Sequence, residues 1–98
     1  MDRVSIAIAR AEKKIADRIA SGATTPEKVE SAGLALDMDV HEYYRFQELK
    51  SLAVAEGKLS QEEAQTVYGL IGNSPRTFNR LPVAAKSVLN TLFAELLR

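Results

Sequence analysis

The 98-residue sequence contains no cysteine, no tryptophan and a single histidine, His41. The lack of cysteine excludes thiolate metal sites, thiol nucleophiles and a disulfide framework, and it favours a reducing, cytoplasmic setting. Near the N-terminus Arg10, Lys13 and Lys14 interrupt the apolar residues. We therefore predict neither a signal peptide nor a membrane-spanning segment.

An excess of one charge sign is also missing, because 13 basic residues balance 13 acidic ones. The charges are nevertheless segregated along the chain. Residues 1–22 carry five basic and three acidic side chains, residues 23–66 carry four and nine, and residues 67–98 carry four and one. An acidic middle and basic ends either attract each other within the fold or present two faces to a partner.

What the sequence does contain is typical of a globular chain. Hydrophobic residues make up 46% of it, which argues against disorder. Its length suits one domain, spanning residues 1–98, that buries roughly 60–65% of the surface exposed by the unfolded chain.

Helix start and stop signals follow one another along the chain. Start signals are Asp2, Thr25-Pro26-Glu27, Asp37 or Asp39, the capping box Ser60-Gln61-Glu62-Glu63, Ser74-Pro75 and Pro82. Stop signals are Gly22, Gly33, Gly57 and Gly72-Asn73. Apolar residues recur between these signals with helical spacing, and no segment alternates for long enough to form a strand. We predict an all-α fold, a single compact bundle of four to five helices with short loops, in which 26–32 and 75–80 are short.

The helical spacing also predicts which residues face the core. In 3–20 the stripe is Val4, Ile8, Ala11, Ile15 and Ile19, with Ile6 off the stripe and either buried on a second side or in contact with a partner. In the long helix that Asp37 or Asp39 caps and that runs to about Ala55, the expected core face is Val40, Tyr43, Phe46 or Gln47, Leu49, Leu52 and Ala53.

No catalytic or metal-binding pattern is recognisable. The segment from Asp37 to Glu48 resembles a calcium loop, but Glu42 stands where the turn glycine is needed. His41 is a single ligand without convergent partners, and no glycine-rich phosphate loop is present. We predict a protein that is not an enzyme and that uses no cofactor and no metal.

Two segments carry candidate partner-binding residues. Tyr43, Tyr44 and Phe46 cannot all face one way on a helix, so an exposed tyrosine beside acidic residues predicts a protein contact at Glu42, Tyr44 and Glu48. The alternative is two rings in the core and one lying over the surface.

The second candidate is a helix-turn-helix over residues 61–80. Arg76, Asn79 and Arg80 share a face there and are able to reach phosphates and base edges. Against nucleic-acid binding, Pro82 cuts the second helix short and the chain is neutral rather than basic.

The C-terminal part of the chain also carries a set of cap and core positions, namely Leu59-Ser60, Glu62-Glu63-Ala64, Thr66-Val67-Tyr68, Phe78-Asn79, Pro82, Lys86, Val88-Leu89 and Phe93-Ala94-Glu95-Leu96-Leu97. Through these residues, the segment 59–97 resembles small uncharacterised helical proteins of bacteria, their phages and mobile elements. The resemblance implies a cytoplasmic accessory protein of bacterial or phage origin and carries over no catalytic residue.

These patterns favour a non-enzymatic protein–protein interaction module, regulatory or inhibitory in role. The expected partner is another protein molecule, and a second copy of this chain is one such partner. A DNA-binding protein that uses residues 61–80 is the alternative, and no membrane contact is predicted.

Overall fold

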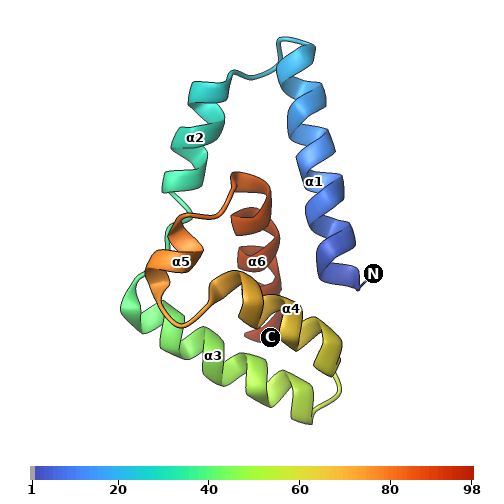
Figure 1. Ribbon diagram of the computed structural model, residues 1–98, viewed down its shortest axis with the longest axis vertical. Helices are drawn as coiled ribbons and strands as arrows, with labels where there is room; N and C mark the ends of the chain where they lie inside the picture. Colours follow the sequence, from blue (N-terminus) through green and yellow to red (C-terminus); the bar gives the residue numbers. More distant parts are fainter. Residues whose placement is uncertain (1) are drawn as a thin grey trace.

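The computed structural model describes residues 2–98, which form helices joined by short connections (Figure 1). The helices are α1 (Arg3–Ala20), α2 (Pro26–Leu34), α3 (Val40–Ala55), α4 (Gln61–Ile71), α5 (Pro75–Asn79) and α6 (Val83–Leu96). The part of the chain that the structure describes has no strand. The prediction of an all-α fold is confirmed.

The number of helices is six rather than four to five. Every predicted segment forms a helix, including the two short ones, each of which begins at its own proline. A proline at the first helical position is already held near the helical φ, which lets even a five-residue helix begin sharply. No helix within residues 2–98 is both long and apolar enough to cross a membrane.

The predicted N-caps are confirmed at four helices. The side chains of Asp2, Thr25, Asp39 and Ser60 each accept a hydrogen bond from the backbone N–H three residues later. At α3 the cap is Asp39 and not Asp37. These bonds satisfy N–H groups that the helix itself leaves unpaired.

Glycines end three of the helices. Gly22, Gly57 and Gly72 all have positive φ, a conformation that residues with a Cβ rarely adopt. After α3, the N–H of Lys58 donates to the carbonyl of Ala53 over 2.8 Å, the long bond of a Schellman motif. Three of the predicted stop signals therefore act as expected.

Gly33 does not end α2, and this prediction is wrong. The helix continues to Leu34, and Gly33 is buried against α6. A Cβ added at Gly33 would lie 2.6 Å from Cγ2 of Val83. The glycine is needed for the close approach of the two helices, and α2 ends one residue later, at Leu34.

Helix α6 lies at the centre of the arrangement. Helices α1, α2 and α3 all pack on it, and α4 packs on α1, α3 and α5. Figure 1 shows α1 and α2 rising beyond α6 and meeting only at their connecting turn. The molecule is elongated as a result, with a longest dimension of 43 Å and a radius of gyration of 13.8 Å, against about 13 Å for a compact chain of this length.

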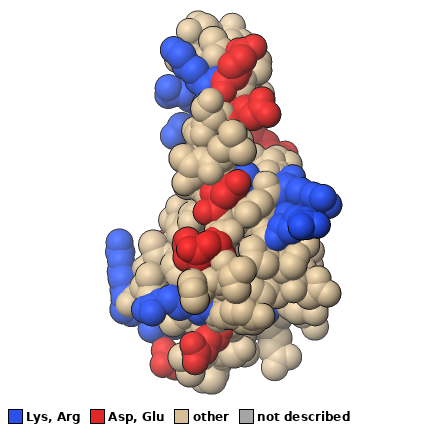
Figure 2. All heavy atoms as spheres, turned by 90° about the vertical axis from the view of Figure 1, so that its left-hand side faces the viewer, with Lys and Arg blue, Asp and Glu red and all other residues tan. Residues whose placement is uncertain are grey.

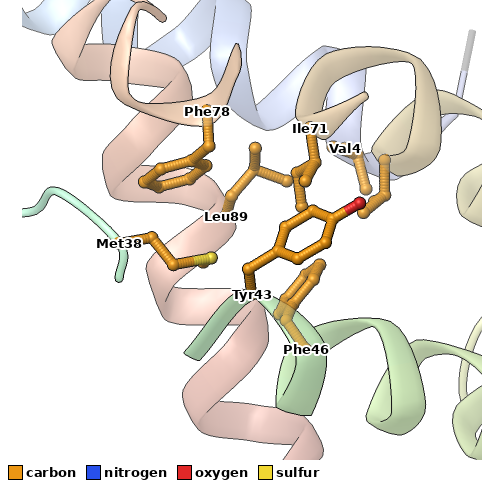
Figure 3. Close-up of a cluster of buried hydrophobic side chains, with 8 residues drawn as sticks. Val4, Met38, Tyr43, Phe46, Ile71, Phe78 and Leu89 are labelled. Carbon is orange, nitrogen blue, oxygen red and sulfur yellow. The ribbon is translucent and has the colours of Figure 1, made fainter. Parts of the chain in front are cut away.

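Most of the helices contribute at least one apolar side chain to the core. Figure 3 shows Val4, Met38, Tyr43, Phe46, Ile71, Phe78 and Leu89 directed towards one another. The side chains of Phe46 and Phe78 are fully buried, and Phe46 also packs against Phe93, with ring centroids 5.3 Å apart. Burial of rings of this size supplies much of the stability of a small domain.

The prediction for the core face of α3 is partly wrong. Tyr43, Phe46 and Ala53 are buried as expected, but Val40 and Leu52 are 54% and 53% exposed. Leu52 lies about 100° around the helix from Ala53, outside the sector that α4 and α6 cover. Tyr43 and Phe46 lie in the core and Tyr44 lies over the surface, as in the alternative considered from the sequence.

Only the beginning of α1 reaches the core. Val4 is buried, whereas Ile8, Ala11, Ile15 and Ile19 of the same stripe are half-buried. Ile6 is exposed, so α1 is not buried on a second side. The outer half of α1 together with the beginning of α2 forms an arm that extends from the core, while the end of α2 packs on α6.

On the face that Figure 2 shows, the charge segregation seen along the sequence does not produce large acidic or basic areas. Figure 2 shows acidic and basic side chains in small separate clusters over a mostly uncharged face. Three ion pairs join parts of the described chain, and two of them link segments of different charge sign, Arg3 to Glu63 and Lys86 to Asp37. Attraction within the fold therefore accounts for part of the pattern.

Candidate functional site

The three candidate residues on α3 do not share one surface. Glu42, Tyr44 and Glu48 are all exposed, and Tyr44 is 66% exposed. Glu48 lies one helical turn after Tyr44 on the same side. Glu42 is two residues before Tyr44 and so about 200° away around the helix. The structure therefore brings Tyr44 and Glu48 together and leaves Glu42 on another face.

A second exposed tyrosine lies across the contact between α3 and α4. Tyr68 of α4 is 54% exposed, and the Nζ atom of Lys50 lies 4.8 Å from its ring centroid. Lys50 also donates a 2.8 Å hydrogen bond to Oε1 of Gln47. Gln47 in turn lies one turn after Tyr44. We call Tyr44, Gln47, Lys50 and Tyr68 the tyrosine surface.

The tyrosine surface rests on buried residues. The ring of Tyr44 meets the ring of Tyr43 edge-on, with centroids 5.4 Å apart. Tyr43 is buried and its hydroxyl donates to the carbonyl of Gly72. The Tyr44 ring thus has a buried, hydrogen-bonded ring on one side, and restraint of this kind lowers the conformational entropy that a partner has to remove on binding.

The polar groups of the tyrosine surface are mainly donors. Burial lowers the pKa of Lys50 from its ordinary value, because the surroundings disfavour the charged form. The Nε2 atom of Gln47 is buried and has no hydrogen-bond partner among the described residues. The partly exposed ammonium group of Lys50 therefore favours an acceptor on a partner, whereas the Nε2 atom of Gln47 lies beneath the surface.

Sequence reasoning missed Lys50, considered Gln47 only as a possible core residue, and noted Tyr68 only within the resemblance. The spacing gives no signal that Tyr68 is exposed, since it lies four residues after Ala64 and three before Ile71, within the apolar pattern of the helix. No local signal exists for the contact between Lys50 and Tyr68, which depends on how α3 and α4 cross.

On α5 the structure separates Asn79 from the two arginines. Arg76 and Arg80 are exposed. The side-chain amide of Asn79 is turned inwards, where its Oδ1 accepts from the N–H of Met38 over 2.7 Å and its Nδ2 donates to the carbonyl of Met38 over 3.1 Å. Asn79 therefore holds the segment before α3 and does not present its amide to a partner.

Two residues of α6 bind the same connecting segment. Lys86 is buried and donates to the carbonyl of Gly33 and to Oδ1 of Asp37, while Asn90 donates to the carbonyl of Leu36. Together with Asn79, these residues form a backbone clasp around residues 33–38. The clasp satisfies the carbonyl groups at the end of α2, where a cation is favoured.

We expect Asn79→Ala to lower the free energy of unfolding by about 1–3 kcal/mol, because it leaves two partly buried backbone groups of Met38 without partners. Arg76→Ala and Arg80→Ala, as exposed neighbours, should change it by less than about 0.5 kcal/mol. Urea unfolding of the three variants measures the difference. Equal stability of all three would contradict the clasp.

A groove of about 450 Å³ lies between the beginning of α1, the α3–α4 connection and α6. Its floor is apolar, with Val4, Val88 and Leu92 among the lining residues, and the Arg3–Glu63 ion pair lies at its edge. Hydrogen bonds from the Arg3 guanidinium and from the Ser60 N–H lower the pKa of Glu63 from 4.5 to about 2. Glu63 is thus a structural anion that joins α1 to the capping box of α4.

This ion pair predicts an acid-sensitive fold. The pKa of Glu63 is about 2 in the folded chain and near its ordinary 4.5 when unfolded, so its stabilisation is complete above pH 4.5 and is lost as the pH falls towards 2. We expect a loss of about 1–2 kcal/mol over this range, since Arg3 is exposed to solvent.

Urea unfolding of the wild type and of Glu63→Gln at several pH values between 7 and about 2 tests this prediction. The variant should be less stable at neutral pH and should show a shallower dependence on pH, so that the two proteins converge in acid. Parallel curves for the two proteins would contradict it.

Within residues 2–98, no three histidine, aspartate or glutamate side chains lie together in a way that could hold a metal ion. Comparisons with protein-family models, with curated proteins and with solved structures found no match for this chain. The function must therefore be argued from the surface that the fold presents.

Proposed function

We propose that this chain is a protein-binding module that recognises its partner through the tyrosine surface. The supporting observation is that Tyr44 and Tyr68 are both more than half exposed, with Tyr43 packed against the first ring and Lys50 against the second. Tyrosines that are large, rigid and partly polar are the side chains that most often dominate protein interfaces. In this proposal the chain acts by binding its partner, and it does so in the cytoplasm.

The donors of the tyrosine surface narrow the chemistry of the contact. Lys50 lies against the ring of Tyr68, and its ammonium group favours hydrogen-bond acceptors on the partner. Glu48, at the edge beside Tyr44, is placed where rim charges influence the rate and the orientation of association more than the affinity.

Site-specific photo-crosslinking tests the proposal. A benzoylphenylalanine at position 44 in cells of the source organism should give one main adduct, which should weaken when Tyr68→Ala is added. The same label at position 42, about 200° around the helix, is the matched control. An adduct of twice the mass of the chain would identify a second copy as the partner. Equal labelling from positions 42 and 44, or none from 44, would contradict the proposal.

DNA binding through α4 and α5 is the second candidate. The observation in its favour is that Arg76 and Arg80 are both exposed, one turn apart, directly after the α4–α5 turn. The five residues of α5 and the inward amide of Asn79 leave little of a recognition helix. Titration with duplex DNA at about 50 and 200 mM salt decides the matter, since binding that depends on salt and on both arginines supports this candidate.

A further inference from the structure

The outward face of α1 is basic and unpaired. Arg10, Lys13, Lys14 and Arg18 are all exposed, and within residues 2–98 none of them forms an ion pair. Their side chains, together with those of Asp17 and Ser21, line a shallow groove of about 520 Å³. We call this surface the basic face of α1.

The basic face is directed away from the rest of the molecule. Arg10 lies about 200° around the helix from Ile8, which is on the stripe that packs towards α6. Lys14 and Arg18 follow Arg10 at intervals of four residues. Each interval advances about 6 Å along the helix, so the three cations form a row on one side of the arm.

We infer that the basic face of α1 is a docking surface for an acidic amphipathic helix of another protein. Carboxylates spaced four residues apart on such a helix also recur about every 6 Å, which matches the row of cations. Ile6 is 37% exposed four residues before Arg10 and offers an apolar contact at the end of the row. This surface is separate from the tyrosine surface, and the inference does not depend on it.

The composition of the groove favours a helix over a continuous polyanion. Asp17 lies within the groove and would repel a phosphate backbone, whereas a protein partner can place a neutral or basic side chain opposite it. Ile6 likewise gains nothing from phosphate but is covered by an apolar side chain of a helix.

A second copy of this chain is a poorer occupant. The other helix of the arm, α2, carries Glu27 and Glu30, but Lys28 lies between them in the sequence, and the short α2 offers no row of acids spaced by four residues. A partner helix with a full acidic row complements all three cations.

The test uses a capped helical peptide of about 20 residues that carries three glutamates spaced by four and one leucine before the first of them. A matched peptide has glutamine at the three positions. At about 20 mM salt we expect the glutamate peptide to bind the full chain about tenfold more tightly than the glutamine peptide. Amide shifts in the NMR spectrum should be confined to residues 6–21.

Charge reversal identifies the face that binds. The double variant Arg10→Glu/Lys14→Glu should remove the tenfold preference, and Ile6→Ser should weaken both peptides equally. Lys28→Glu/Arg45→Glu makes the same change of charge at exposed positions elsewhere and should keep the preference. Helical circular dichroism confirms that each variant is folded.

Three outcomes would overturn the inference. The first is equal affinity for the two peptides, and the second is an equal loss of preference in both charge-reversal variants. The third is tighter binding of duplex DNA or of phosphatidylserine vesicles than of the glutamate peptide, lost in Arg10→Glu/Lys14→Glu, which would make the surface a site for polyanions or lipid.

Discussion

Replacing Phe46 by alanine should lower the free energy of unfolding by about 3–5 kcal/mol. The ring is fully buried between α3 and the rest of the core and packs against Phe93. Its removal leaves a cavity that the surrounding helices cannot close without losing their contacts. For a domain of this size the loss is a large part of the total stability of about 5–15 kcal/mol.

Tyr44→Ala is the matched control, because it removes an aromatic ring only two positions away on the same helix. Since Tyr44 is 66% exposed, this change should cost less than about 1 kcal/mol. Urea unfolding followed by circular dichroism measures both variants. A loss in Tyr44→Ala as large as that in Phe46→Ala would show that α3 is rotated from the position described.

The second large effect concerns the backbone clasp. Asp37→Ala removes the carboxylate partner of Lys86, whose side chain is only 5% exposed. The ammonium group would then keep the Gly33 carbonyl as its one acceptor. We expect a loss of about 2–3 kcal/mol, at the lower end for a broken buried pair because Asp37 is partly exposed.

Lys86→Met provides the comparison, because it removes the charge and keeps the length of the side chain. This variant should change the stability by no more than about 1 kcal/mol, since no charge is left buried and Asp37 can turn towards water. Thermal and urea unfolding of the two variants and of the double variant measure the difference. A larger loss in Lys86→Met than in Asp37→Ala would contradict this account of the clasp.

Local chemistry made the helices predictable from the sequence. A capping side chain and the N–H that it binds are three residues apart, as at Ser60 and Glu63, so the whole interaction lies within a few letters of sequence. The same holds for Gly57, whose positive φ serves a turn of its own neighbours. Interactions of this kind do not depend on how the helices later pack.

The orientation of α3 was less predictable. Val40 and Leu52 are apolar and have suitable spacing, yet both are exposed because α4 and α6 cover a narrower sector of the helix. Gly33 was misread for a similar reason. A glycine near the end of a helix is typical of a stop signal, and only the approach of Val83, 50 residues later, shows its actual role.

In the candidate site, too, local features could be predicted from the sequence and contacts between helices could not. The exposure of Tyr44 follows from the three aromatic residues that cannot all face inwards, and the sequence predicted it as a candidate. The partnership of Lys50 with Tyr68, and the inward amide of Asn79, join residues 18 and 41 positions apart in the chain. Such contacts become visible only when the helices are placed.

The most direct test of the proposed function is the double variant Tyr44→Ala/Tyr68→Ala. Its stability is measured, and so is its yield of the photo-crosslinked adduct. For the second measurement the crosslinking label is placed at position 51, one turn along α3 from Gln47. Stability within about 1 kcal/mol of the wild type together with loss of the adduct is the predicted result. An adduct of undiminished yield in a folded double variant would contradict the claim that the tyrosine surface binds the partner.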